Sequence, residues 1–182
     1  MKSQDFIITY TKLMFSPLEA KEQDIDITDI AHALSLMCRA NGHIRHFYSV
    51  AQHSINCLLE SKIRGLSEKV QVACLLHDAS EAYLSDITRP IKRSLPQYIE
   101  FEEVLQNKIY KKFRLHDLTE QDFIHLKEID DSMLYYEMLE LMGEKIFAEE
   151  PVLLSKPDFK QRRFEEVREE FLRHYAGLIS KI

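Results

Sequence analysis

The stretch from Val72 to Asp86 reads VACLLHDASEAYLSD: an apolar run ends in a His-Asp pair, and a glutamate follows the histidine by four residues. On a helix of 3.6 residues per turn, His77 and Glu81 lie on the same stripe as the apolar residues before them. A charge carried into a core is costly unless it is paired or binds a metal. Asp78 projects about 100° away from His77 on an ideal helix, so both reach one metal only beside the helix or where the helix is distorted. A helix end with solvated polar residues is the alternative interpretation.

Length and composition favour one globular domain over residues 1–182. The chain is 45% hydrophobic, which is enough for a substantial core. Its net charge of -6 provides no basic surface for duplex nucleic acid, so we expect no duplex partner. Because no apolar run approaches the roughly 20 residues that span a bilayer, we also expect no membrane association.

The cysteines indicate a reducing compartment. There are three of them (Cys38, Cys57 and Cys74), an odd number without Cys-x-x-Cys spacing, on apolar helical faces. We interpret them as small core residues of a cytoplasmic protein.

Apolar periodicity and capping residues predict an all-α bundle of about six helices behind a short N-terminal β-hairpin. Four glycines and five prolines in 182 residues fit long helices. We expect a strand pair within residues 6–27, in which Ile25–Ile27 repeats the alternation of Phe6–Tyr10. The predicted helices run from Asp26 or Thr28 to about Asn41-Gly42, from Ser49, from Ser67 to about Leu84, over 96–113, from the Thr119–Asp122 capping box to Gly143, and over 158–179. Residues 86–96 and 144–157 are predicted loops.

Two of these helices carry further inward polar residues. His53 follows Val50 by three residues and precedes Cys57 by four, so it points into the core. Asp130 interrupts the apolar stripe of the fifth helix, whereas Asp131 points toward water. A satisfied core histidine is the alternative interpretation of His53 alone.

Taken together, His53, His77, Asp78 and Asp130 form a nitrogen and oxygen ligand set. Such a set suits one divalent ion, namely Mn, Co, Fe, Ni, Zn or, less well, Mg. Four protein ligands leave room for water on a six-coordinate ion. Glu81 would orient that water or protonate a leaving oxygen. The basic loop 86–96 suits an anion-binding rim, although it also reads as a solvated connection.

The order of these four residues resembles the H…HD…D signature of HD-domain metal-dependent phosphohydrolases. Residues 75–81 (LLHDASE) and 86–92 (DITRPIK) resemble the bacterial 5'-deoxynucleotidases of that superfamily. Residues 29–35 (DIAHALS), Gly42-His43 and residues 48–54 (YSVAQHS) resemble a related branch that includes phage dATP triphosphohydrolases. The resemblance covers about residues 25–140.

The resemblance implies an all-helical core with one divalent metal and hydrolysis of nucleotide phosphoesters. It also implies a role for each matching position: His53, His77, Asp78 and Asp130 as metal ligands, Glu81 in acid-base chemistry, Asp86 as a second carboxylate beside the substrate, and Arg39 and Lys92 at the phosphate. An acidic residue seven positions beyond the last ligand, as Glu137 is here, supports Asp130 over Asp131. Relatives associate, so we expect a homo-oligomer.

One departure concerns substrate selection. Deoxynucleotidases follow the arginine with a tryptophan, whereas Ala40 follows Arg39 here and the chain has no Trp. Selection for deoxyribose or for phosphate number therefore does not carry over. We expect hydrolysis of a 5'-(deoxy)nucleoside monophosphate, with two alternatives: a dNTP triphosphohydrolase that releases tripolyphosphate, and a nucleotide-sensing binding module with vestigial hydrolysis.

Overall fold

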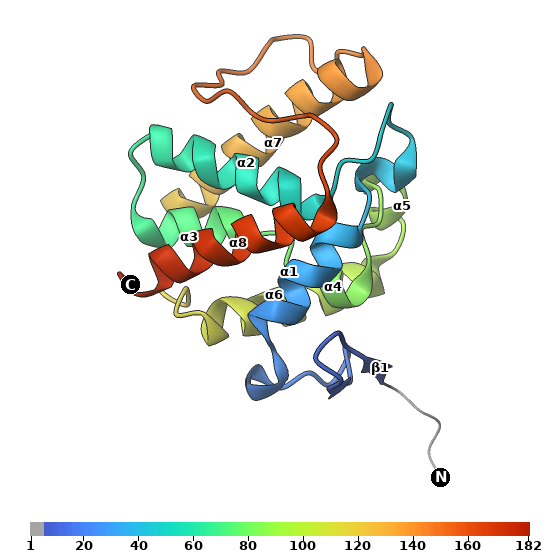
Figure 1. The fold of residues 1–182 in the computed structure, drawn as a ribbon, viewed down its shortest axis with the longest axis vertical. Coiled ribbons are helices and arrows are strands. Elements are labelled where there is room, and N and C mark those ends of the chain that lie inside the picture. Colours follow the sequence, from blue (N-terminus) through green and yellow to red (C-terminus); the bar gives the residue numbers. More distant parts are fainter. Residues whose placement is uncertain (1–5) are drawn as a thin grey trace.

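The computed structural model of the protein describes residues 6–182, and the first five residues of the predicted domain lie outside the described part. The described chain is mostly helical, as predicted (Figure 1). A small antiparallel sheet near the N-terminus pairs β1 (Ile7–Ile8) with β2 (Met14–Phe15). Within residues 6–182, helices of nine or more residues are α1 (Ile27–Leu36), α2 (Val50–Ile63), α3 (Glu68–Leu76), α6 (Pro96–Lys112), α7 (Glu120–Met142) and α8 (Phe164–Ile179). Two four-residue helices, α4 (Glu81–Leu84) and α5 (Arg89–Lys92), lie between α3 and α6.

The predicted caps begin three of the long helices. Ser49 accepts a hydrogen bond from the backbone N–H of Gln52 at the start of α2, and Ser67 accepts one from the backbone N–H of Val70 at the start of α3. Thr119 and Asp122 form the predicted capping box of α7. Of the two candidate caps for α1, Asp26 is the one that accepts from a backbone N–H.

The core forms around α2, which packs against α1, α3, α7 and α8 (Figure 1). Leu58 of α2, Leu75 of α3 and Phe171 of α8 are fully buried in the main hydrophobic cluster. Burial of each such side chain contributes roughly 1.5–3 kcal/mol to folding. A smaller apolar cluster of Cys57, Val70, Cys74, Ile129 and Met133 lies where α2, α3 and α7 meet.

Two predicted boundaries near the N-terminus are wrong. The second strand is Met14–Phe15 and not Ile25–Ile27. The first helix ends at Leu36 and not near Asn41-Gly42, because Met37 and Arg39 leave the helix to pair with the chain that enters α2. Backbone bonds from Val50 N to Met37 O and from Arg39 N to Tyr48 O, both 3.0 Å, replace the helical ones.

Two later boundaries also differ from the prediction. The third helix ends at Leu76 instead of running to about Leu84, and the residues after it form a tight turn before α4. The last helix begins at Phe164 instead of residue 158. The residues of its predicted first turn are extended instead. The amide of Gln52 in α2 donates hydrogen bonds to the carbonyl oxygens of Asp158 and Lys160, which would otherwise accept within the helix. The predicted loop 86–96 contains the short helix α5.

Residues 144–163 form an irregular segment that passes over α2 before α8 begins (Figure 1), and we call this segment the strap. Three polar residues, one on each successive turn of α2, hold its backbone. Gln52 Nε2 donates to Lys160 O at 2.8 Å, and Asn56 Nδ2 donates to Asp158 O at 3.2 Å. The buried carboxylate of Glu60 accepts from the backbone N–H groups of Leu154 and Ser155 at 3.1 and 2.7 Å. These contacts satisfy backbone groups that a strap without regular structure would otherwise leave unpaired.

Within the described part of the chain, no helix combines the length and the apolar character that crossing a membrane requires.

Candidate metal centre

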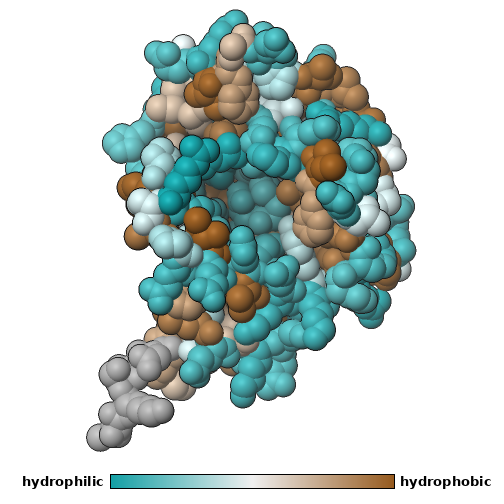
Figure 2. Space-filling model, turned by 180° about the vertical axis from the view of Figure 1, so that it is seen from behind, coloured by the Kyte–Doolittle hydropathy of each residue, from teal (hydrophilic) through white to brown (hydrophobic). Residues whose placement is uncertain are grey.

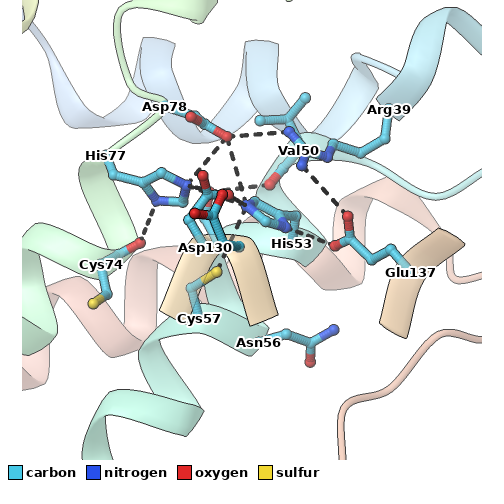
Figure 3. Close-up of polar contacts among 12 residues, drawn as sticks. Arg39, Val50, His53, Asn56, Cys57, Cys74, His77, Asp78, Asp130 and Glu137 are labelled. Atoms are coloured by element: carbon cyan, nitrogen blue, oxygen red, sulfur yellow. Dashed lines mark hydrogen bonds and ion pairs between the residues drawn. The ribbon is translucent and has the colours of Figure 1, made fainter. Parts of the chain in front are cut away.

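The four residues singled out as metal ligands converge from three parts of the fold (Figure 3). His53 comes from α2, His77 and Asp78 follow α3, and Asp130 comes from α7. His53 Nε2 lies 3.1 Å from His77 Nε2 and 3.2 Å from Asp130 Oδ1. His77 Nε2 lies 3.3 Å from Asp78 Oδ2, which is also 3.7 Å from His53 Nε2.

The end of α3 explains how His77 and Asp78, adjacent in sequence, face one point. Backbone bonds after Leu76 join residues three apart, as between Ala79 N and Leu76 O at 3.0 Å and between Glu81 N and Asp78 O at 3.1 Å. This tighter winding replaces the continuous helix on which the two side chains would diverge. The distortion that a shared metal requires is therefore present in the backbone.

The contacts of the other ring nitrogens decide which atoms face the centre. His77 Nδ1 lies 2.8 Å from the carbonyl oxygen of Cys74, which only accepts, so Nδ1 carries the hydrogen. His53 Nδ1 lies 2.6 Å from Glu137 Oε1 and donates to that carboxylate in the same way. In a neutral ring, the form that binds a metal, the Nε2 lone pair therefore points at the other histidine and at the two aspartates. Burial opposes protonation of both rings, but the nearby acidic groups raise the pKa of His53 and of His77, which without a metal favours a proton on Nε2 that is donated to Asp130.

Donor atoms that converge in this way repel one another unless protons or a metal cation lie between them. Ligands bound at 2.0–2.2 Å lie roughly 2.8–3.1 Å apart when adjacent around an octahedral ion and roughly 3.3–3.6 Å apart around a tetrahedral ion. The shortest distances between the donor atoms here are 3.1, 3.2 and 3.3 Å, so the residues fit one divalent metal. Burial opposes the charge on Asp130, yet hydrogen bonds from His53 and His77 hold the pKa of its carboxyl well below its usual value.

A fifth donor, Cys57, completes a group that can hold a metal ion. Cys57 Sγ lies 3.6 Å from His53 Nε2, and the donor atoms of His53, Cys57 and His77 all lie within 4.8 Å of one another. Burial raises the pKa of the Cys57 thiol to about 11. Sequence reasoning treated Cys57 as a core residue, although its position four residues after His53 on one helix face was the signal that could have found it.

Glu137 and Arg39 support the centre from the side of α7 and the α1–α2 connection. Glu137 is fully buried and accepts from His53 through Oε1 and from Arg39 Nη2 through Oε2 at 3.4 Å. Arg39 Nη1 also donates to Asp78 Oδ2 at 3.3 Å. Burial opposes ionisation of Glu137, but the charges of His53 and Arg39 lower the pKa of its carboxyl, which stays anionic. Such outer partners orient imidazole ligands in known metal sites.

A cavity of about 480 Å³ is lined by two of the four ligands, Asp78 and Asp130, and by Arg39, Glu81, Asp86 and Lys92. The face opposite that of Figure 1 is hollowed, with hydrophilic residues at the floor of the hollow (Figure 2). Glu81 is almost fully buried, and its Oε2 has no hydrogen-bond partner. Burial, with the nearby charges of Asp78 and Asp86, raises the pKa of Glu81 well above its usual value. Burial also raises the pKa of Asp86.

The cations around this cavity are paired with acidic residues. Lys92 Nζ binds Glu102 at 2.7 Å and lies 3.9 Å from Glu81 Oε1. Arg89, which the sequence reasoning did not single out, binds Asp130 Oδ2 at 2.9 Å and Asp131 Oδ1 at 3.1 Å. Asp131 therefore lies beside Arg89 and turns away from the imidazoles.

Comparison with known proteins shows relatives along most of the chain. No protein-family model matches it. It is 42% identical over 110 residues to an uncharacterized protein of Escherichia coli strain K12, YfdR; the match covers 60% of this chain and 59% of the length of that protein. It is 31% identical over 177 residues to an uncharacterized protein of Rhodobacter capsulatus, a match that covers 90% of both chains. The chain belongs to the family of this Rhodobacter capsulatus protein.

Proposed function

We propose that the protein is an HD-domain metal-dependent phosphohydrolase that cleaves the phosphoester of a 5'-(deoxy)nucleoside monophosphate. The observation that carries this proposal is the convergence of the His53, His77, Asp78 and Asp130 side chains, whose donor atoms meet at one point. The buried carboxyl group of Glu81, whose pKa burial raises, and a cavity lie beside that point.

A divalent ion held by these four side chains would polarise a phosphoryl oxygen and lower the pKa of a bound water. The second oxygen of Asp130 is engaged by Arg89, and the Nδ1 hydrogens of both histidines are engaged by Cys74 and Glu137. These three ligands are thus held in one orientation before substrate arrives, which would reduce reorganisation during the reaction.

Glu81 is suited to act as the general acid. Burial and the nearby carboxylates of Asp78 and Asp86 raise the pKa of Glu81 well above its usual value, which favours the protonated carboxyl, and Oε2 has no partner within the described residues. The carboxyl would donate its proton to the oxygen that leaves with the nucleoside. General acid catalysis of this kind contributes roughly 10²–10⁴-fold to a rate.

The cavity lining contains side chains suited to both parts of a nucleotide. Arg39 and Lys92 would bind the phosphate, and the apolar side chains of Leu134, Met138 and Ile146 would contact the base or sugar. The volume of about 480 Å³ lies within the roughly 300–1,000 Å³ of small-molecule sites.

The test is a screen of (deoxy)nucleoside mono- and triphosphates with Mn²⁺, Co²⁺ or Mg²⁺ that identifies the phosphate species released. We expect orthophosphate from a monophosphate. Release of tripolyphosphate from a dNTP would establish the triphosphohydrolase alternative instead, and nucleotide binding without turnover would establish the sensing module. The Glu81→Gln variant separates metal binding from catalysis, because it should bind metal as the wild type does and lose about 10²-fold or more in turnover.

A further inference from the structure

Cys57 lies at the buried end of the metal centre, away from the cavity lining. It is 1% exposed and belongs to an apolar cluster with Val70, Cys74, Ile129 and Met133. His53 and Cys57 are separated by one turn of α2, so their donor atoms face the same way (Figure 3). The sulfur is therefore a donor that the oxygen-rich set of His53, His77, Asp78 and Asp130 leaves unused.

Two of the three distances among His53, Cys57 and His77 are close to those of a tetrahedral zinc site. With Zn–S near 2.3 Å and Zn–N near 2.05 Å, sulfur and nitrogen ligands lie about 3.6 Å apart and two nitrogen ligands about 3.3 Å apart. Cys57 Sγ lies 3.6 Å from His53 Nε2, which lies 3.1 Å from His77 Nε2. The third pair, Cys57 Sγ and His77 Nε2, lies within 4.8 Å, so a shift of about 1 Å closes the triangle.

We propose that the centre contains two overlapping metal positions, and that zinc occupies a closed one formed by His53, Cys57, His77 and Asp130. Manganese, magnesium and other hard ions occupy the oxygen-rich position that includes Asp78. The proposal depends on the shared imidazoles and Asp130, and it holds whether or not the protein hydrolyses nucleotides.

Ligand chemistry separates the two positions. A thiolate selects zinc and cobalt over manganese and magnesium, which prefer oxygen. When the sulfur binds zinc, the thiol proton leaves to water. When zinc occupies the closed position, the Asp78 carboxylate keeps a partner, because Arg39 Nη1 lies 3.3 Å from its Oδ2. Four protein ligands around a tetrahedral ion leave no place for water, which is the pattern of structural rather than catalytic zinc.

The test uses metal-free full-length protein titrated anaerobically with Co²⁺, a spectroscopic substitute for zinc. We expect the near-ultraviolet charge-transfer absorption of a cobalt–thiolate bond, together with the strong visible bands of four-coordinate cobalt. Cys57→Ser should lose both features. The matched control is Cys74→Ser, since Cys74 is equally buried in the same cluster and lies outside the donor group.

Metal affinities provide the second readout. Competition with a chromophoric chelator should show that Cys57→Ser binds zinc at least about tenfold more weakly, while its affinity for Mn²⁺ stays within about twofold of the wild type. A wild-type cobalt spectrum without the thiolate band, or unchanged zinc affinity in Cys57→Ser, overturns the proposal. Should Cys57→Ser fail to fold, X-ray absorption of the zinc-loaded wild type decides, because a sulfur neighbour near 2.3 Å supports the proposal and nitrogen and oxygen neighbours alone overturn it.

These outcomes are independent of turnover. A cobalt–thiolate band in a protein that hydrolyses no nucleotide supports the zinc position and refutes the proposed function. Nucleotide hydrolysis by a protein that shows no cobalt–thiolate band supports the proposed function and refutes the zinc position.

Discussion

Glu137→Gln is the substitution that most directly tests how the centre is held together. The two carboxylate oxygens of Glu137 each accept from a different donor, His53 Nδ1 at 2.6 Å and Arg39 Nη2 at 3.4 Å. A glutamine of the same shape has one accepting oxygen and one donating NH₂ group. One of the two donors must therefore face the NH₂ group.

Either outcome of that conflict is unfavourable. If the NH₂ group faces His53, the ring gains a lone pair at Nδ1 and a hydrogen at Nε2, where it blocks the metal. If it faces Arg39, a buried donor loses its partner, which costs about 1–3 kcal/mol. Loss of an outer partner of a ligating histidine weakens metal binding by roughly 10–100-fold, or about 1.4–2.7 kcal/mol.

The assay is Mn²⁺ binding by isothermal titration, with thermal unfolding of the metal-free protein alongside. For a chain of this size, 1–3 kcal/mol corresponds to a fall of about 2–12 °C in melting temperature. Glu140→Gln is the control, because Glu140 lies on the same helix one turn later and is exposed. Metal affinity and melting temperature equal to those of the control would show that Glu137 does not orient His53.

Three further outcomes are expected. Burial and the charges of Asp78 and Asp86 raise the folded-state pKa of Glu81, so the stability that its proton contributes is complete below the unfolded-state pKa and is lost as pH rises through the folded-state pKa. In thermal scans with a chelator, the melting temperature of Glu81→Gln should therefore rise further above that of the wild type as pH increases. A difference in melting temperature that does not change with pH would contradict this. Asp130→Asn should weaken Mn²⁺ binding at least about tenfold in titrations while Asp131→Asn stays within about twofold, and the reverse order would exchange their assignments. Mn²⁺ at 100 times its Kd should stabilise the fold by about 2.7 kcal/mol, or about 5–11 °C in a thermal scan, and Asp130→Asn at the same concentration should show a much smaller rise.

Local signals were sufficient for helix starts and insufficient for several helix ends. Ser49, Ser67 and the Thr119–Asp122 pair begin α2, α3 and α7 through contacts within three residues, so the amino-acid pattern contains the whole interaction. The end of α1 depends on pairing with residues 48–50, and the start of α8 depends on side chains of α2 about 100 positions away. The residues next to these helix ends do not include the partners that determine them, so local sequence patterns cannot predict where the two helices end or begin.

The candidate site divides along the same line. The choice of Asp130 over Asp131 rested on the apolar stripe of α7 and on the acidic residue seven positions further on that the family resemblance implies, and it is Asp130 that lies against the imidazoles. The hydrogen bond between Glu137 and His53 joins residues 84 positions apart, so no local pattern indicates that Glu137 contacts the imidazole. The contact of Arg89 with the centre could not be predicted for a similar reason, because its partners Asp130 and Asp131 lie about 40 residues away in the sequence, on α7.

The two-sided attachment of α2 has a mechanical consequence. Gln52 and Asn56 hold the strap on one side, and the residues that directly follow them in sequence, His53 and Cys57, face the metal centre on the other. Rotation of α2 about its own axis, or a slip by one residue, would break both sets of contacts together. An insertion or deletion within this helix should therefore be tolerated far less than one in the hairpin turn before β2, and the angle at which His53 is presented is set from outside the centre as well as from within it.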